Sequence, residues 1–425
     1  MLEAIKTAIK LPDLRKKLIW TLVLLGIFRL GSLVPIPGPW DLKRLGDIFK
    51  GNSVFGLLDM MAGGGLANMS VFAMSVNPYI TASIIMQLLT MVIPQLEQMA
   101  KEGGEGRKII AQYTRYATVV LAIIQGTALA FGLRAAMIAP TVWDIVLAII
   151  TLTTGAVLLM WLGEVLSERG IGNGISMIIF AGIVARVFPS IKQLFDLLRG
   201  QSAIGLTLVS IILFIALIIA VVAGVVFVTQ GERKIPVQYA KRIVGRKMYG
   251  GTSTYLPIKV NHSGVIPVIF ASSILAFPPT IAQFLEPGHW LYKALNIVAP
   301  GRTLYLIIYA ILIFLFTYFY TAITFNPLEV SDNMKKYGGF IPGIRPGKPT
   351  AEYLDRVLTR ITLAGALFLT VIALLPYLIN LVPAFKTLQV QFGGTAVLIA
   401  VGVAIDTMKQ IEAQLLMRQY EGFLK

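Results

Sequence analysis

The residue types that carry most enzyme chemistry are scarce in this sequence. It has no cysteine and only two histidines, His262 and His289. Neither an HExxH zinc motif nor a GxSxG nucleophile motif is present. Both histidines fall in or beside loops expected on opposite faces of the molecule, which favours structural roles for them. The sequence therefore predicts no enzyme activity, no metal centre and no cofactor, and the missing cysteines leave the redox compartment undetermined.

Carboxylates are absent from the centres of the long apolar segments. Asp144, Glu164 and Asp406 lie near the ends of such segments. A proton- or sodium-coupled transporter is expected to place carboxylates near the middle of the membrane. The glycine pattern GIGNG at residues 170–174 lacks the rest of a nucleotide-binding fingerprint, so we interpret it as a tight turn.

The stretch at residues 51–94 carries the most informative pattern. Residues 53–61 have the spacing of a short amphipathic helix that ends at three glycines, Gly63, Gly64 and Gly65. Residues 51–65 reach only about 20 Å as a helix, against a hydrocarbon core of about 30 Å. Residues 71–93 are long enough to cross and begin with the polar residues Asn77, Thr81 and Ser83. Such a broken segment predicts a polar cavity inside a membrane protein; the alternative is a helix lying on the outer surface.

The composition identifies an integral membrane protein. Of 425 residues, 56% are hydrophobic and 14% are charged, which is too apolar for a soluble globular protein. We expect an all-α fold with ten transmembrane helices and the short helix in addition. The expected spans are 18–34, 71–93, 113–133, 145–166, 171–188, 203–228, 264–284, 304–325, 361–379 and 395–417.

Basic residues set the expected orientation. The formal net charge is +16, and most of the 37 lysines and arginines fall in the amino-terminal arm or in loops on the same side as this arm. The positive-inside rule therefore places both termini in the cytoplasm. Ten spans divide into residues 1–200 and 201–425, and an odd number of spans in each half inverts the second half relative to the first.

Two long basic loops are expected on the cytoplasmic side, at about residues 230–262 and 326–360. Solvated loops that obey the positive-inside rule need no partner. These loops are also long and aromatic, which favours docking of something acidic, such as ribosomal RNA or a motor protein. The candidate contacts are Arg233, Lys234, Lys241, Arg242, Arg246, Lys247, Lys335, Lys336, Arg345 and Lys348.

Several motifs resemble the SecY family of bacterial protein-conducting channels. The most specific are KVNHSGVIP at residues 259–267 and FIPGIRPG at residues 340–347, and the resemblance covers essentially the whole chain. It implies an hourglass pore between two inverted five-helix halves, a plug helix near residues 51–65, a hydrophobic pore ring and a lateral gate to lipid. It also implies SecE-like and SecG-like small subunits, the motor ATPase SecA or ribosomes as partners, and signal peptides and unfolded polypeptides as substrates.

The resemblance assigns roles to individual residues. The pore ring is expected at Ile80, Ile84, Ile175, Ile179, Ile269 and Ile399. The apolar and polar positions of the plug are Ser53, Val54, Phe55, Leu57, Leu58, Met60 and Met61. Candidate polar contacts across the lateral gate are Gln87, Gln125, Ser272 and Ser273. General packing is the alternative for each of these positions taken singly.

The sequence thus predicts a passive channel in the bacterial plasma membrane, which passes unfolded polypeptides and releases transmembrane segments sideways into membrane lipid. A partner motor or ribosome supplies the driving force. A secondary transporter of a small solute is the alternative, and an intramembrane enzyme is a weaker third. A channel should move polypeptide only with its motor and should take up no solute with ions, and this behaviour distinguishes it from a secondary transporter.

Overall fold

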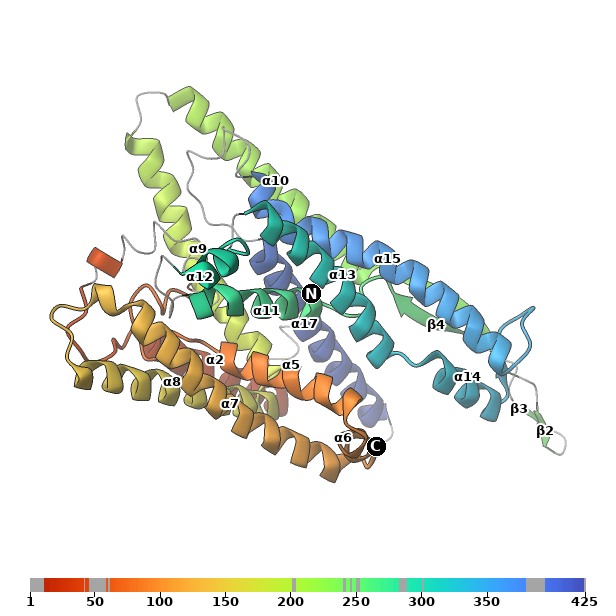
Figure 1. Ribbon diagram of the computed structural model, residues 1–425. Coiled ribbons are helices and arrows are strands. Elements are labelled where there is room, and N and C mark those ends of the chain that lie inside the picture. The colour runs from red at the N-terminus through yellow and green to blue at the C-terminus, as the bar shows by residue number, and fades with distance from the viewer. Residues whose placement is uncertain are drawn as a thin grey trace.

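The computed structural model describes residues 11–41, 43–45, 59, 62–200, 204–239, 242–244, 247–249, 253–282, 289–299, 302–379 and 394–423. Long helices dominate this part of the chain, and a small group of strands extends from one end of the helix bundle (Figure 1). The fold is therefore helical, as the composition predicts.

The first half of the chain contributes the helices that follow the amino-terminal arm. They are α2 (Pro12–Gly31), α5 (Asn77–Val92), α6 (Pro94–Lys101), α7 (Gly104–Gly132), α8 (Val142–Arg169) and α9 (Gly174–Gly200). Helix α2 begins at Pro12, whose fixed φ angle suits the first turn. Helix α8 begins with a capping box in which Thr141 and Asp144 exchange hydrogen bonds. Asp144 is thus the third residue of this capping box.

Helix α5 is shorter than the sequence predicted. Residues 71–76 form turns, with Ser75 at a φ of +52°, and the helix begins only at Asn77. Its 16 residues span about 24 Å. Pro94 then ends it, because the residue before a proline is driven out of the helical region, and Ile93 has φ −97° and ψ 112°. Helices α5 and α6 meet at a bend of 101°.

The second half supplies a similar number of helices. They are α10 (Ile204–Gln230), α11 (Ile266–Ala282), α12 (Trp290–Asn296), α13 (Thr303–Thr324), α14 (Pro327–Lys336), α15 (Lys348–Ile379) and α17 (Gly394–Phe423). Helix α11 packs against α13, α13 packs against α15, and α17 contacts both α9 and α10. Helix α17 therefore connects the second half to the first.

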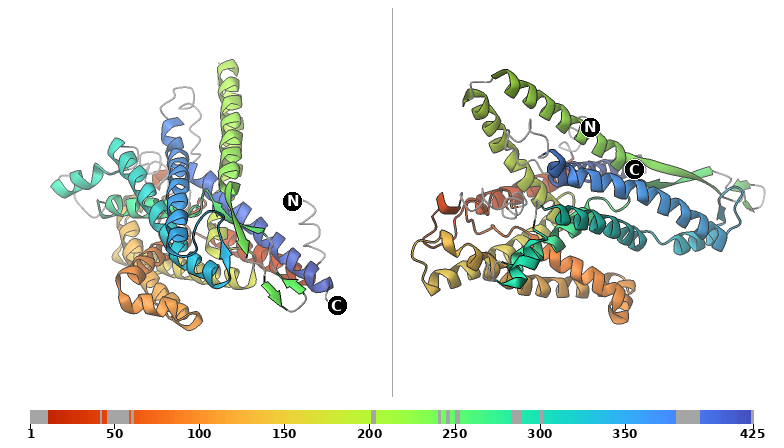
Figure 2. Two further views of the ribbon diagram at one scale, coloured as in Figure 1. Left: turned by 90° about the vertical axis from the view of Figure 1, so that its right-hand side faces the viewer. Right: turned by 45° about the horizontal axis from the view of Figure 1, so that its top comes forward.

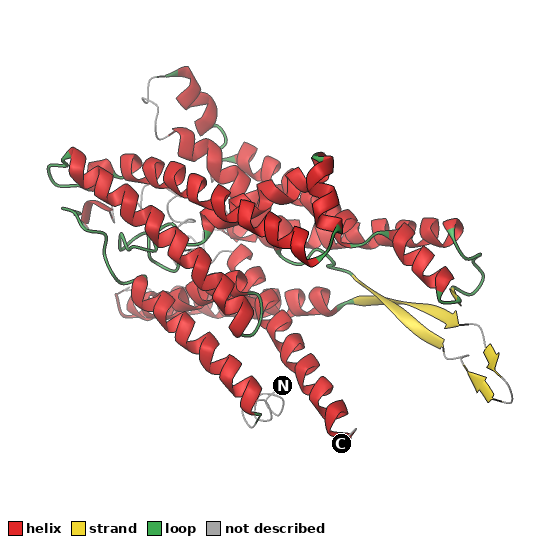
Figure 3. Cartoon of the chain, turned by 90° about the horizontal axis from the view of Figure 1, so that it is seen from below, coloured by secondary structure: helices red, strands yellow, loops and turns green. Residues whose placement is uncertain are grey.

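The two predicted basic loops contain strands. Strand β1 (Glu232–Tyr239) pairs antiparallel with β4 (Ser253–Lys259), from Glu232 opposite Lys259 to Gln238 opposite Ser253. Strand β5 (Gly339–Phe340) joins the other edge of β1, giving the order β4-β1-β5. Strands β2 (Arg242–Val244) and β3 (Lys247–Tyr249) lie between β1 and β4 in the sequence and pair only with each other among the described strands. Figure 3 shows the strands extending beyond the helices.

Among the described residues, six helices are long and apolar enough to cross a membrane, or seven if α5 and α6 form one broken span. The apolar parts of α9 and α11 are shorter, at Gly174–Val187 and Ile266–Pro279. Helix α2 carries several charges near its start, which lower its mean hydropathy. The full count of ten spans remains a prediction.

The helices expose large apolar side chains on the outside of the bundle. Trp143 and Trp161 of α8 are 80% and 57% exposed, and Phe227 of α10 is 81% exposed. Helix α10 stands at the edge of the bundle, where much of its surface is uncovered (Figure 2). Such surface is costly in water and is the surface expected of helices that face lipid.

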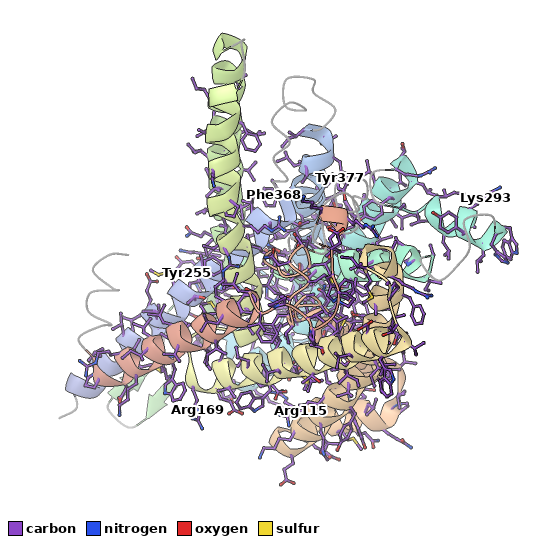
Figure 4. The ribbon with its side chains drawn as sticks, turned by 90° about the vertical axis from the view of Figure 1, so that its left-hand side faces the viewer. Arg115, Arg169, Tyr255, Lys293, Phe368 and Tyr377 are labelled. Atoms are coloured by element: carbon purple, nitrogen blue, oxygen red, sulfur yellow. The ribbon has the colours of Figure 1, made fainter. Side chains whose placement is uncertain are left out.

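The GIGNG hairpin between α8 and α9 forms a structural junction. The backbone N–H of Ile171 donates to the Thr21 hydroxyl at 3.1 Å, and that of Gly172 donates to Gln410 Oε1 at 2.9 Å. The Arg169 guanidinium lies 5.4 Å from the ring centre of Trp20, which is a cation–π contact. Figure 4 shows Arg169 on the same side of α8 as Arg115. This motif is the predicted turn, and it joins α2, α9 and α17.

Candidate functional site

The isoleucines assigned to a pore ring lie together in the largest hydrophobic cluster of the described residues. Helix α5 contributes Ile80 and Ile84, α9 contributes Ile175 and Ile179, α11 contributes Ile269, and α17 contributes Ile399. Ile80, Ile84, Ile179, Ile269 and Ile399 are each at most 9% exposed, and Ile175 packs against the edge of the cluster. Four helices from both halves thus contribute side chains to one hydrophobic cluster.

Local sequence explains how α9 reaches this contact. A Cβ on Gly174 would lie 1.9 Å from the Gly163 carbonyl oxygen of α8. A Cβ on Gly163 would lie 2.3 Å from Ile175 Cδ1. Glycine at position 174 permits this backbone approach, so the first turn of α9 lies directly against α8. Ile175 and Ile179, at i and i+4, then share one face of α9.

The candidate ring residues are all apolar. Their isoleucine side chains offer no hydrogen bond and no charge to a molecule that passes. A narrow apolar constriction loses its water easily and so obstructs ions. Branched aliphatic side chains also contact any extended peptide without selecting one sequence.

The plug positions named from the resemblance lie outside the described residues. These positions are Ser53, Val54, Phe55, Leu57, Leu58, Met60 and Met61. The structure does describe Asp59 and residues 62–70, which we call the plug root. Ala62, Leu66, Met69 and Ser70 in the root are at most 1% exposed. The root is therefore firmly packed.

Asp59 is a site residue that the sequence analysis did not identify. It is 3% exposed and forms an ion pair with Arg186 of α9. Its Oδ1 also accepts a hydrogen bond from the backbone N–H of Ala67 at 2.7 Å. The signal available in the sequence was a single carboxylate within a short apolar segment, since charges placed in such segments are costly unless paired.

A cavity of about 710 Å³ lies between α2 and α9. Its walls are mostly apolar, with Leu25, Phe28 and Phe180 among them, and Arg29 and Lys192 add positive charge. Arg29 Nη1 donates to the carbonyl oxygen of Gly63 at 3.2 Å. The cavity wall and the plug root therefore share Arg29.

The helices that carry the lateral-gate candidates, α5, α7 and α11, are in contact. Helix α5 packs on α7, α11 packs on α13, and both α5 and α7 touch α11. We call the contact of α5 and α7 with α11 the seam. Gln87 of α5 is exposed, whereas Gln125, Ser272 and Ser273 are half-buried.

The hydrogen bonds described for the gate candidates run within single helices. Gln87 Nε2 donates to Ser83 Oγ at 3.4 Å, and Ser272 Oγ donates to the Ile269 carbonyl at 2.9 Å. Both bonds are local to their own helix. A role across the seam remains a prediction for these residues.

The two predicted basic loops form a single unit, which we call the cytoplasmic sheet unit. Strand β5 of the second loop pairs with β1 of the first. Ile235 and Ile258 from the sheet, Ile341 beyond β5 and Leu354 of α15 share one hydrophobic cluster. Arg233, Lys234, Lys335, Lys336, Arg345 and Lys348 are exposed on this unit. Residues 241 and 246 lie outside the described part, as do the side chains of Arg242 and Lys247.

Arg345 is exposed on a rigidly built turn of that unit. Its carbonyl oxygen accepts from the Thr350 hydroxyl at 2.8 Å, and the Gly347 carbonyl accepts from Ser331 Oγ at 2.7 Å. Gly343 and Gly347 have φ angles of +82° and +100°, which favour glycine. The guanidinium therefore projects from a fixed backbone.

The remaining candidates have structural surroundings. His262 contacts the Phe325 ring edge-on at 5.7 Å between ring centres, and burial, then the charge of Lys259, lowers the pKa of His262. His289 caps α12 by accepting from the Leu291 N–H. Glu164 pairs with Arg115 at 2.8 Å, and Asp406 is exposed. The described residues hold no group of three or more metal-ligating side chains.

Comparison with known proteins decides the family. A family model described as SecY matches residues 70–408. A curated relative from Streptomyces scabiei, "Protein translocase subunit SecY", is 48% identical over the full length of both chains. The chain belongs to the SecY family. As a SecY-family protein it is a protein translocation channel and not an enzyme, and it crosses the membrane several times.

Solved structures agree with this SecY assignment at the level of the fold. A structure described as showing that the plug domain of the SecY protein stabilises the closed state has a TM-score of 0.65 and 20% identity, with 96% of each chain covered. Sec61 in a canine ribosome–channel complex has a TM-score of 0.62 and 19% identity, also with 96% coverage of each. No comparison supports a solute transporter.

Proposed function

We propose that unfolded polypeptides cross the membrane through the isoleucine cluster described above. In this proposal Ile80, Ile84, Ile175, Ile179, Ile269 and Ile399 form the constriction. The observation that carries the proposal is that these six isoleucines, which come from both halves of a SecY-family chain, lie in or directly against one buried hydrophobic cluster. Residues 1–200 and 201–425 act as the two bodies between which the polypeptide passes.

Membrane segments leave this channel through the seam. Helices α5 and α7 lie on one side of it and α11 lies on the other. Hydrogen bonds between membrane helices contribute about 0.6 kcal/mol each on average, so a seam with few of them opens at low cost. Gln87, Gln125, Ser272 and Ser273 are the polar residues proposed to act there, and signal peptides and lipid are its proposed contacts.

The cytoplasmic sheet unit receives the partner that drives transport. Its exposed basic residues suit the phosphates of ribosomal RNA, and the relative solved with a ribosome favours that partner. A motor ATPase of the SecA type is the second partner, because Arg345 offers a fixed guanidinium for bidentate pairing with a carboxylate. Small subunits like SecE and SecG complete the channel by covering exposed apolar helix surface.

The distribution of basic residues supports a location for the protein. Residues 1–17, 230–262 and 326–360 carry 18 of the 37 lysines and arginines, so the amino-terminal arm and the sheet unit face the cytoplasm, with the termini on that side. The relatives are bacterial, which favours the plasma membrane of a bacterium.

Reconstitution tests the proposal directly. The chain is placed in liposomes with a SecE-like subunit, and uptake of an unfolded polypeptide is followed by its protection from added protease. Uptake is expected only when the motor and ATP, or a translating ribosome, are present. Empty liposomes and heat-inactivated motor serve as controls. Ion-coupled uptake of a small solute without polypeptide uptake would overturn the proposal in favour of a transporter.

A further inference from the structure

The cavity between α2 and α9 lies along two helices that run in the same direction. The Thr21 hydroxyl of α2 accepts a hydrogen bond from the backbone N–H of Ile171, just before α9. Further along both helices, Arg29 of α2 donates to the Gly63 carbonyl, and a Cβ on Gly63 would lie 2.7 Å from Gly182 Cα of α9. These contacts occur in the same order on both helices, so corresponding ends of α2 and α9 lie together.

The lining of this cavity changes from apolar to cationic along the two helices. Leu25 and Phe180 lie nearer the starts of α2 and α9, whereas Arg29 and Lys192 lie further along them. From Phe180 to Lys192 the wall on α9 extends about 18 Å along the helix axis. The hydrocarbon of one bilayer leaflet is about 15 Å thick, half of the whole core. The cavity therefore has the length and the polarity of one phospholipid in its leaflet.

The described residues around the cavity do not neutralise its cations. Arg29 donates to two uncharged groups, the Gly63 carbonyl and, at 3.5 Å, the Ser32 hydroxyl. No acidic residue is among the described residues that line the cavity. Arg186 lies close enough to Arg29 to repel it electrostatically, and the Asp59 carboxylate pairs with Arg186. A cation at membrane depth is costly without a counter-charge, so the cavity favours an anionic occupant.

The cationic end of the cavity lies away from the cytoplasmic sheet unit. Figure 1 shows the carboxyl end of α9 at the opposite end of the molecule from the strands. The positive-inside rule leaves that side of a membrane protein poor in lysine and arginine. The same two helices expose apolar side chains, among them Leu22 and Leu30 of α2 and Val187 of α9. Such surfaces suit lipid tails on either side of the cavity.

We propose that this cavity binds one anionic phospholipid from the leaflet opposite the cytoplasmic sheet unit. Arg29 and Lys192 bind its phosphate, and one acyl chain lies along Leu25, Phe180 and Val184. A phosphodiester suits these cations, because arginine can pair with two of its oxygens at once and lysine attracts it as a point charge. The lipid site rests on the membrane orientation given under the proposed function and is independent of polypeptide transport.

Native mass spectrometry of the full chain in detergent tests the lipid site. The probes are phosphatidylglycerol, which is anionic, and phosphatidylcholine, which has the same tails and no net charge. The wild type should retain one phosphatidylglycerol more tightly than phosphatidylcholine. Lys192→Gln should weaken retention of phosphatidylglycerol about fivefold, the effect expected of one basic residue near anionic lipid. Arg29→Gln with Lys192→Gln should remove the preference for the anionic lipid.

Control variants separate this site from a general attraction of lipid to positive charge. Arg134→Gln with Arg302→Gln removes two exposed cations outside the cavity and should retain phosphatidylglycerol as the wild type does. Ala185→Trp fills part of the cavity wall without changing the charge, and it should weaken retention of both lipids. Thermal unfolding in detergent without added lipid identifies any variant that fails to fold.

The single lysine variant carries the test whether or not the double variant folds, because it leaves the contact of Arg29 with Gly63 in place. Equal retention of phosphatidylglycerol by the wild type and a folded Lys192→Gln variant would overturn the lipid site. An equal loss in the control with Arg134 and Arg302 replaced would overturn it too, since binding would then follow overall charge.

Two further outcomes would assign the cavity to another occupant and so overturn the lipid site. Inorganic phosphate could raise the unfolding midpoint of the wild type as much as phosphatidylglycerol does, which would show that only an anion binds. A small SecE-like subunit could displace the lipid when added, which would make the cavity a protein interface. Polypeptide uptake is measured separately, and its failure in a wild type that retains the lipid would count against the proposed channel function alone.

Discussion

Gln238 of β1 lies opposite Phe340 of β5 in one antiparallel sheet. This single pairing joins two segments that the sequence presents as separate loops. Ile235, Ile258 and Ile341 also share one hydrophobic cluster, so the two segments pack together as well as pair. Arg345 and the basic residues of β1 therefore occupy fixed positions relative to each other, so a partner can contact both at once.

Arg345→Glu should abolish motor-driven transport and leave membrane insertion unchanged. The substitution reverses the charge of an exposed side chain on a rigid turn, while the Arg345 carbonyl can still accept from Thr350. Translocation of a protease-protected polypeptide in liposomes measures the effect. Lys336→Glu, an equal change of charge on α14, is the matched control and should retain more activity. Normal transport by the Arg345 variant would remove this residue from the docking site.

The first basic loop, at about residues 230–262, should contribute to ribosome binding through its positive charge. Replacing Arg242, Arg246 and Lys247 with glutamate should weaken ribosome affinity. The slope of log affinity against log salt should fall by about 0.7–0.9 for each phosphate that the variant no longer neutralises, because fewer counterions are released. Co-sedimentation over a series of salt concentrations gives both quantities. If the ribosome affinity and its salt slope are both unchanged, these three residues do not bind the ribosome, and their charge reflects the positive-inside rule alone.

Polar substitution in the isoleucine cluster should open the resting channel to ions. Ile80, Ile175 and Ile269 replaced by asparagine put hydrogen-bonding groups where an apolar constriction excludes water. Planar-bilayer recording without motor should show persistent conductance. Deleting residues 53–65 should give shorter, flickering openings, since the cluster remains in place. Equal silence of wild type, cluster variant and deletion would mean that neither element seals the pore.

His262 should make the folded state less stable in acid. Burial lowers its pKa, so the folded chain binds the proton less well than the unfolded chain, whose histidine pKa is about 6.5. The contribution of His262 is complete above that value and declines as pH falls from 6.5 toward the lower pKa of the folded state. Thermal unfolding in detergent at pH 5.5 and 7.5, at one scan rate, should show a smaller pH effect for His262→Asn than for the wild type.

The histidine prediction has a matched control in the second histidine of the chain. His289 is exposed and caps the short helix α12. His289→Gln should leave the difference in midpoint between the two pH values close to that of the wild type. Identical pH dependence in the wild type and in His262→Asn would show that other groups carry the acid sensitivity.

The sequence by itself determined the membrane environment, the helical fold and the helix face that Ile80 shares with Ile84 and Ile175 with Ile179. These properties depend on composition and on spacing along one helix, which are local. Residues 4 apart share a helix face wherever that helix packs. The motif resemblance added the family, which the comparisons confirm. It did not reveal the late start of α5, because the turns before Asn77 are set by packing against Gly155 of α8.

Only the tertiary structure decided which distant segments meet. The pairing of β5 with β1 and the ion pair of Asp59 with Arg186 each join residues far apart along the chain. In both pairs, the local sequence of one member does not predict the other. The edge of a strand can pair with many strands, and a carboxylate can pair with any nearby cation. Packing selects among these partners, because burying a backbone group or a charge without a partner costs free energy. The observed arrangement pairs both the strand edge and the carboxylate.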